Sequence, residues 1–496
     1  MTPTVLINRA RPTLGPWLIV LIVAAASTGW WTYLTLRRAD GLATAAFDQA
    51  YFQQLVWSMS VGQGLRSSFN PGDFLGLHLS PLLAIPAALQ GLWPDARLLT
   101  VMQSIALGAA LPAAFLFIRT LLRPARSAAW VAAALVLPLA IWPITQQQVR
   151  ADFHTEVLAL PAVFIAGWAG LSRRHGLMLG AALAALLARE DQVYPVAIMG
   201  LVIAAHGRGR LTGPARPGGL ALIGLAVTWA VLAFGVVKPA LRAGATYDTD
   251  GYYAWLGGGL GVLRLPFERT QELIMALTQP IGWSMVGWSV VALGGLALLR
   301  PRWLVLVLPP VVAHFLSRQP PQAQIGLQYG LLLVVPLVVA SGLGARRLLA
   351  LVARFGRRRR GLARSRAIPT ILGIGLVVSG IVAAFGRGAV PPFSGQEPAF
   401  WNRPAAITTV RAIARQVPPD VPLAVDWGLA SAVASRRHLQ VFPAISADAF
   451  VLVDGRPYVS GRLRWVDRAS FLAELASSGR MLLVDDGRFQ LWGPLP

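Results

Sequence analysis

Residues 16–36 read PWLIVLIVAAASTGWWTYLTL, an apolar stretch without a charged side chain. An α-helix needs about 20 such residues to cross roughly 30 Å of hydrocarbon. Arg9 and Arg11 precede the stretch, and no small-residue cleavage site follows it. The sequence therefore predicts a retained membrane anchor with its N-terminus in the cytoplasm.

Comparable apolar runs recur along the chain, each bounded by arginines or polar turns. They predict an all-α polytopic membrane protein with about eleven spans, at residues 16–36, 98–118, 128–145, 156–172, 176–188, 192–205, 218–238, 277–299, 303–317, 325–345 and 367–386. Several of these spans are short and require tilt or a locally thin bilayer. The apolar run 79–93 is shorter than most, and counting it would place the arginines at 119–126 opposite the other basic loops. We expect it to be an interfacial or re-entrant helix.

The composition excludes an ordinary soluble enzyme, because 55% of the 496 residues are hydrophobic and only 13% are charged. A net charge of +23 would suggest nucleic acid as a partner of a soluble chain. In this chain, 21 of the 44 basic residues fall in the predicted cytoplasmic loops, and all 21 acidic residues fall on the other side. The charge therefore indicates orientation, and no nucleic-acid partner is expected.

The weakest point of this topology is the pair of runs 176–188 and 192–205. They could form one long helix with Arg189, Glu190 and Asp191 at mid-membrane, which would reverse the orientation of every later span. The arginine-rich loop 206–217 favours two separate spans.

Residues 387–496 differ in composition from the rest, since polar residues return and apolar runs shorten to strand length. We predict a small extracytoplasmic α/β domain after a transmembrane domain at 1–386, which carries a large external loop at 37–97. The expected strands are 422–425, 439–442, 450–453, 481–484 and 489–492, with helices at 427–437 and 469–478.

The external loop begins with a predicted helix over residues 42–60. At 100° per residue, Asp48 falls in the middle of its apolar half. A carboxylate in that position must be paired, protonated or used for chemistry. The alternative to a chemical role is a structural ion pair with Arg37, Arg38 or Arg66.

Further polar clusters fall on the same side. Asp152, His154 and Glu156 would point the same way in an extended segment and could then hold a divalent metal ion. The alternative is that Asp152 and Glu156 cap the helix that follows.

The charged triplet Arg189, Glu190 and Asp191 lies below the outer surface, because the residues back to Arg174 are too few to span the membrane. Charges at that depth usually line a functional cavity, although an internal ion pair is equally consistent with the sequence. His78 begins the short apolar run as a cap or a ligand. Arg318 could hold a phosphate or anchor its helix at the headgroups.

In their order and common side, these blocks resemble the GT-C superfamily of polytopic glycosyltransferases. Within that superfamily, the segments Ala46–Gln49, Leu77–Pro81, Asp152–Glu156, Arg189–Asp191 and Ala430–Gly455 resemble an uncharacterised bacterial family of predicted membrane proteins. The resemblance implies a protein of the bacterial plasma membrane.

The resemblance also implies a polyprenyl-phosphate sugar donor and inverting transfer to a glycan, lipid or protein acceptor, with Asp48 as the base. It implies that Arg189 or Arg318 holds the lipid phosphate. The remaining polar residues would bind sugar or acceptor: His78, Asp152, His154, Glu156, Glu190 and Asp191.

Two other functions are consistent with the sequence. Ionisable groups in membrane helices also mark transporters and lipid-handling permeases. A non-catalytic assembly protein could use residues 387–496 to bind an envelope partner. The confinement of charged clusters to one end of the spans favours the enzyme.

Overall fold

The computed structural model describes residues 14–495 except 71, 126, 207–214, 243, 258–260, 357–366, 395–397 and 457–467. Some of the arginines that predict the orientation of the spans lie outside the described residues, namely Arg9, Arg11, Arg126, Arg208, Arg210 and the arginines within 357–366.

Every predicted span corresponds to helical structure. Six described stretches are long and apolar enough to cross a membrane, at Leu14–Asp40, Arg97–Leu121, Ala128–Arg150, Pro217–Arg242, Pro320–Arg354 and Thr370–Arg387. Shorter apolar helical stretches occur at Thr155–Leu171, His175–Leu186 and Pro301–Phe315. Helices α10 (Val193–His206) and α15 (Pro280–Ala292) coincide with the two remaining predicted spans. The number of crossings and their orientation stay predictions.

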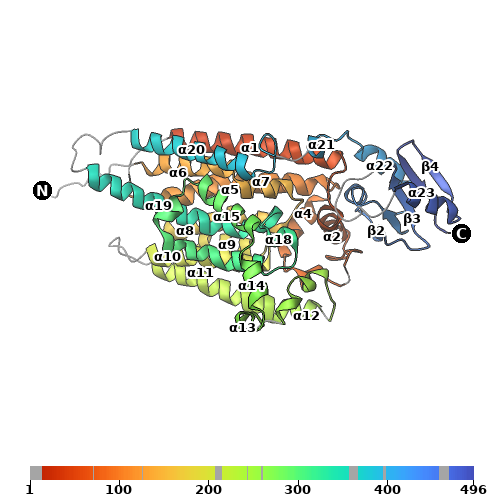
Figure 1. The fold of residues 1–496 in the computed structure, drawn as a ribbon, viewed down its shortest axis with the longest axis horizontal. Helices are drawn as coiled ribbons and strands as arrows, with labels where there is room; N and C mark the ends of the chain where they lie inside the picture. The colour runs from red at the N-terminus through yellow and green to blue at the C-terminus, as the bar shows by residue number, and fades with distance from the viewer. Residues whose placement is uncertain are drawn as a thin grey trace.

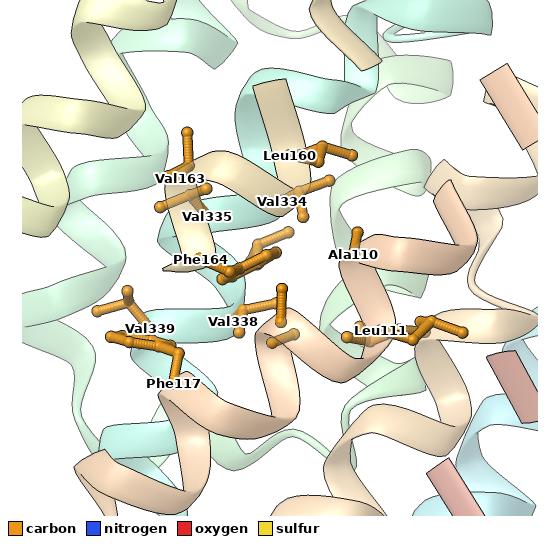
Figure 2. Close-up of a cluster of buried hydrophobic side chains, with 14 of the residues drawn as sticks. Ala110, Leu111, Phe117, Leu160, Val163, Phe164, Val334, Val335, Val338 and Val339 are labelled. Carbon is orange, nitrogen blue, oxygen red and sulfur yellow. The ribbon is translucent and has the colours of Figure 1, made fainter. Parts of the chain in front are cut away.

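The core of the helical part includes residues of α5 (Arg97–Leu121), α8 (Ala159–Leu171) and α19 (Leu331–Gly356), among other helices. Figure 2 shows Phe117, Phe164 and Val338 from these helices packed against one another. The long helices run along the long axis of the molecule, and the C-terminal strands lie at one end of it (Figure 1).

The helical backbone is interrupted between α9 (His175–Leu186) and α10, as two separate spans require. Arg189 has φ −169° and ψ 151°, which is extended backbone, and a short 3-10 turn, η5 (Glu190–Gln192), follows it. One continuous helix through Arg189 is therefore wrong. The break places three charged residues in a turn between two apolar helices.

The external loop contains η1 (Ala46–Ala50), α2 (Tyr51–Ser60), α3 (Phe74–Leu77), η2 (Pro81–Leu83) and α4 (Ala84–Leu89). The predicted helix 42–60 thus begins later, and its first turn is a π-helix. The helical part of the run 79–93 is confined to η2 and α4, which are too short to span a membrane.

The C-terminal region contains α22 (Ile407–Ala414), β1 (Leu423–Val425), β2 (Leu439–Val441), β3 (Phe450–Asp454), α23 (Arg468–Ser477), β4 (Leu482–Asp485) and β5 (Phe489–Trp492). The strand order is β2-β1-β3-β5-β4. Strands β2, β1 and β3 are parallel, whereas β5 is antiparallel to both β3 and β4. The expected strands are thus confirmed to within a residue or two. Helix α20 (Ala367–Arg387) ends next to residue 386, and the domain boundary at that residue stays a prediction.

The predicted helix 427–437 is wrong, because only the short turn η14 (Ala430–Ala432) forms there. Carbonyl groups within this segment and at its end accept hydrogen bonds from other elements. Arg411 donates to the Ala432 carbonyl, and Gln54 donates to the carbonyls of Arg436 and Arg437. Contacts with the external loop therefore override the local helical pattern.

Candidate functional site

Most of the predicted site residues converge where the external loop meets the ends of α7 (Pro143–Arg150), α9 and α12 (Lys238–Arg242). Ion pairs and hydrogen bonds connect these residues into two groups. One group surrounds Asp48 and His154, and the other surrounds Glu190. Arg318 belongs to neither group.

Asp48 faces the imidazole of His154, with 3.4 Å between Oδ1 and Nε2. His154 Nδ1 lies 3.0 Å from the backbone carbonyl of Asp152 and donates to it, which leaves Nε2 directed at the carboxylate. Burial lowers the pKa of His154, but the hydrogen bond and negative charge of Asp48 outweigh it and raise that pKa above its ordinary value. The raised pKa therefore favours a protonated His154 beside the Asp48 carboxylate.

The Asp48 side chain is 36% exposed, so the expected desolvation of this carboxylate is wrong. Asp48 lies in the π-helical turn η1, where 100° per residue does not hold. The polar half of this helix is not exposed as its composition suggests, since Gln49, Gln53 and Gln54 are buried. The alternative of a structural ion pair with Arg37, Arg38 or Arg66 is wrong, because the ion pair of Asp48 is with His154.

Asp152 is a buried structural carboxylate. Its side chain pairs with Arg38 and accepts a 2.6 Å hydrogen bond from the backbone of Ala45, while Arg38 also donates to the Arg150 carbonyl. These contacts tie the end of α1 (Leu14–Asp40) and the start of η1 to the segment that carries His154. Asp152 therefore holds the Asp48–His154 pair in place.

Glu156 pairs with Arg189, and Arg189 Nε also lies 3.4 Å from Asp191 Oδ2. Burial raises the pKa of Asp191 to about 6, although the positive charge of Arg189 opposes the shift. Tyr329 lies within electrostatic range of Asp48, Glu156 and Arg189. The Asp48 carboxylate and the mostly buried Arg189 guanidinium thus lie in the surroundings of the same aromatic hydroxyl, that of Tyr329.

The segment 152–156 does not form the predicted metal site. Among the residues that the structure describes, no group of three or more His, Asp or Glu side chains is arranged to hold a metal ion. Asp152 is engaged by Arg38, His154 by Asp48 and Glu156 by Arg189. The expected capping role is also wrong, because η4 (Thr155–Leu158) has no side-chain cap.

Glu190 connects three segments of the chain. Its carboxylate accepts from Lys238 Nζ at 2.6 Å and from the Leu79 backbone at 3.0 Å, and it lies 3.0 Å from His78 Nδ1. Burial opposes ionisation of Glu190, but the charges and hydrogen bond of its partners outweigh it and lower its pKa. Glu190 and His78 thus hold the external loop against the hairpin formed by α9, η5 and α10.

Lys238 was not predicted as a site residue, although the sequence carries a signal for it. It is the only lysine of the chain, which otherwise uses arginine for its basic positions. Lysine offers a compact ammonium that fits between Glu190 and the ring of Phe234, 5.1 Å away.

Arg318 lies apart from these groups, at the mouth of a cavity of about 340 Å³ lined by Trp255, Glu272, Met275 and Phe315. Its guanidinium pairs with Glu272 and stacks over Trp255 at 4.5 Å, and 57% of its side chain is exposed. No described contact joins Arg318 to Asp48 or to the hairpin residues. Of these two arginines, Arg189 is the one that shares a neighbour with Asp48, since both lie within electrostatic range of Tyr329.

The fold and site together define a polytopic helical membrane protein whose buried charges gather at the end adjoining a small α/β domain. Residues 38–451 match the family described as "Predicted membrane protein (DUF2079)", and the chain belongs to this family. This confirms the membrane-protein family that the sequence blocks resemble. Comparison with curated proteins gives no match.

The chain is also similar to crystal structures of ArnT from Cupriavidus metallidurans. The structure bound to undecaprenyl phosphate has 11% sequence identity and a TM-score of 0.49, and the apo structure has 12% and 0.47. Each comparison covers 97% of this chain and 98% of that chain. TM-scores at this level assign neither an activity nor a ligand to the present protein.

Proposed function

We propose that this protein is an integral-membrane glycosyltransferase that uses a polyprenyl-phosphate-linked sugar and Asp48 as general base. The observation that carries the proposal is the Asp48–His154 pair, a partly exposed carboxylate held by a fixed imidazole. The other ion-paired carboxylates of the cluster are more deeply buried. Asp48 is thus the carboxylate of the cluster best placed to meet a substrate.

In the proposed step, an acceptor hydroxyl attacks the anomeric carbon with inversion and gives its proton to Asp48. The bond between that carbon and the phosphate oxygen breaks, and its electron pair leaves with the lipid phosphate. A general base in this position contributes about 10²–10⁴-fold to the rate. The His154 imidazole keeps the Asp48 carboxylate oriented.

The departing phosphate needs fixed positive charge. Arg189 is the proposed source, since its mostly buried guanidinium lies within electrostatic range of Tyr329, as Asp48 does. Its Nε has no hydrogen-bond partner among the described residues, although it lies near Asp191. We place the site on the extracytoplasmic face of the bacterial plasma membrane, together with residues 387–496.

The decisive variant is Asp48→Asn, which keeps the shape of the side chain and removes its basicity. Membranes containing the variant should transfer labelled sugar from synthetic undecaprenyl-phosphate sugars at least about 100-fold more slowly than wild type. Asp420→Asn is the matched control, because Asp420 is 76% exposed and has only a 3.8 Å contact with Arg437. Normal transfer by a correctly inserted Asp48→Asn variant would exclude Asp48 as the base.

A second measurement separates the enzyme from a permease or an assembly protein. Mass spectrometry of the purified protein should find a polyprenyl phosphate or its glycoside, reduced in Arg189→Gln. Recovery of ordinary phospholipids alone would count against a lipid-linked donor.

A further inference from the structure

Three partly exposed aromatic side chains pack together where η1, which carries Asp48, meets the C-terminal domain, and they come from two distant parts of the chain. Phe47 precedes Asp48 directly, and its ring centroid lies 5.5 Å from that of Phe69 and 5.1 Å from that of Trp427. Trp427 belongs to the C-terminal domain and follows β1 by two residues. We name Phe47, Phe69 and Trp427 the aromatic platform.

The C-terminal domain is held firmly against the external loop at this point. Ala46 and Ala50 of η1 share one apolar core with Leu429 and Val410. The hydroxyls of Thr44 and Ser431 lie 2.6 Å apart. Figure 1 shows α2 directly beside the C-terminal domain. Trp427 therefore has a fixed position relative to η1.

A second connection is ionic. Arg411 of α22 holds both carboxylate oxygens of Asp95, at 2.7 and 2.8 Å, and Asp95 also pairs with Arg97 at the start of α5. Trp427, Phe47 and Phe69 pack against this core and are only partly covered by it, so part of each side chain stays exposed.

Ring contacts continue from the platform to His154, the ionic partner of the proposed base. Tyr51 lies 6.3 Å from Phe69 and 5.8 Å from Phe52, and Phe52 lies 5.6 Å from His154. The inner rings, Tyr51 and Phe52, are buried, whereas the platform and Asp48 are partly open to solvent. The platform and Asp48 are thus both partly accessible, and Phe47 of the platform is the residue next to Asp48 in η1.

We infer that the aromatic platform binds the acceptor and that the acceptor is a saccharide, an inference that rests on the proposed glycosyltransferase function. A sugar ring has apolar C–H faces and hydroxyl groups at its rim. Aromatic rings pack against such faces with large contact area and little loss of side-chain freedom. A ring stacked on Trp427 and Phe47 would present a rim hydroxyl to Asp48, so Trp427 is a positioning residue supplied by the C-terminal domain.

Saturation-transfer NMR on the full-length protein in detergent tests this inference with soluble tetrasaccharides of glucose, galactose, mannose and N-acetylglucosamine. Wild type should bind at least one of them, with the strongest transfer to C–H protons of one ring face. Trp427→Phe should retain binding, whereas Trp427→Leu should weaken it at least about tenfold. Trp30→Leu is the control, because Trp30 is exposed and stacks only on Tyr33 among the rings described.

The Leu and Phe variants separate stacking from packing, since both fill apolar space but only Phe offers an aromatic face. Equal binding by these two variants and wild type would overturn the role of Trp427. Failure of wild type to bind any of the four saccharides, or preferential binding of a Ser/Thr-rich peptide, would overturn the acceptor class.

Failure of the proposed function is recognisable separately. Asp48→Asn should still bind the saccharide while it loses transfer. If the Asp48→Asn variant transferred sugar at the wild-type rate, the base would be wrong, and the saccharide-binding result would still decide the role of the platform.

Discussion

Asp48 and Glu190 are carboxylates in the same cluster, but their surroundings differ. Asp48 is 36% exposed and has one ionic partner at 3.4 Å, whereas Glu190 is buried and bonded to Lys238, His78 and the Leu79 backbone. Because its carboxylate oxygens are engaged by three partners, Glu190 is a structural brace. The carboxylate of Asp48 has fewer partners and is left able to accept a proton. Depth in a membrane protein is therefore not a sufficient sign of chemistry, because the number of partners matters as much.

The largest effect on stability is expected from Glu190→Gln. The change leaves the Lys238 ammonium, whose side chain is 19% exposed, without its counter-charge. Breaking a fully buried ion pair costs about 3–5 kcal/mol, which is the upper limit of the loss expected here. Thermal unfolding in detergent, followed by intrinsic fluorescence, should show a clear drop in Tm.

Glu474→Gln provides the control, since Glu474 is exposed on α23. An unchanged Tm for Glu190→Gln would mean that Glu190 is not a brace, and the contrast with Asp48 would disappear. The double variant Glu190→Gln with Lys238→Met should lose less stability than the two single changes together, because they share one interaction.

A smaller effect is expected from Arg411→Ala, which removes the two hydrogen bonds to Asp95. Loss of one partner of a mostly buried ion pair costs about 2 kcal/mol or more. Hydrogen exchange should increase in α22 and in the loop after β1, while the helical part stays protected.

Arg415→Ala is the control for Arg411, because Arg415 is an exposed residue one turn further along the chain. If exchange rose equally throughout the protein, the contact would support global stability rather than docking of the C-terminal domain.

The smallest effect is expected from the Asp48–His154 pair itself. Because Asp48 raises the pKa of His154, its stabilising contribution is complete below the ordinary histidine pKa of about 6.5 and is lost as the pH rises through the raised value. The gain should be less than about 1 kcal/mol for a partly exposed pair.

Tm measured from pH 5 to 9 checks this sign. The difference between wild type and Asp48→Asn should be greatest near pH 5–6 and shrink at higher pH. A difference that grew with pH would show that His154 is neutral beside Asp48.

The sequence predicted the cluster better than it predicted the partners within it. The order and common side of Asp48, His154 and Arg189 followed from hydropathy and loop position, and the structure brings these residues together. The metal-binding alternative for 152–156 failed because Arg38, 114 positions away, occupies Asp152. A local spacing rule carries no information on a partner at that separation.

The same limit applies to Trp427 and Lys238. Hydropathy places Trp427 in a separate region with a predicted helix, whereas hydrogen bonds from Gln54 and Arg411 unwind that segment and fix it against η1. Lys238 was visible as the only lysine, but composition does not say which of the many carboxylates it meets.

The sequence by itself determined the helical membrane part, because a backbone in hydrocarbon must satisfy its hydrogen bonds internally and long apolar runs can do so only as helices. It also determined that the acidic residues cluster outside those runs. Only the tertiary structure decided which carboxylate remains partly free, because ion pairing depends on side chains that meet across long sequence separations. Arg38, Arg189 and Lys238 engage Asp152, Glu156 and Glu190, whereas the ion pair of Asp48 among the described residues is with His154 alone.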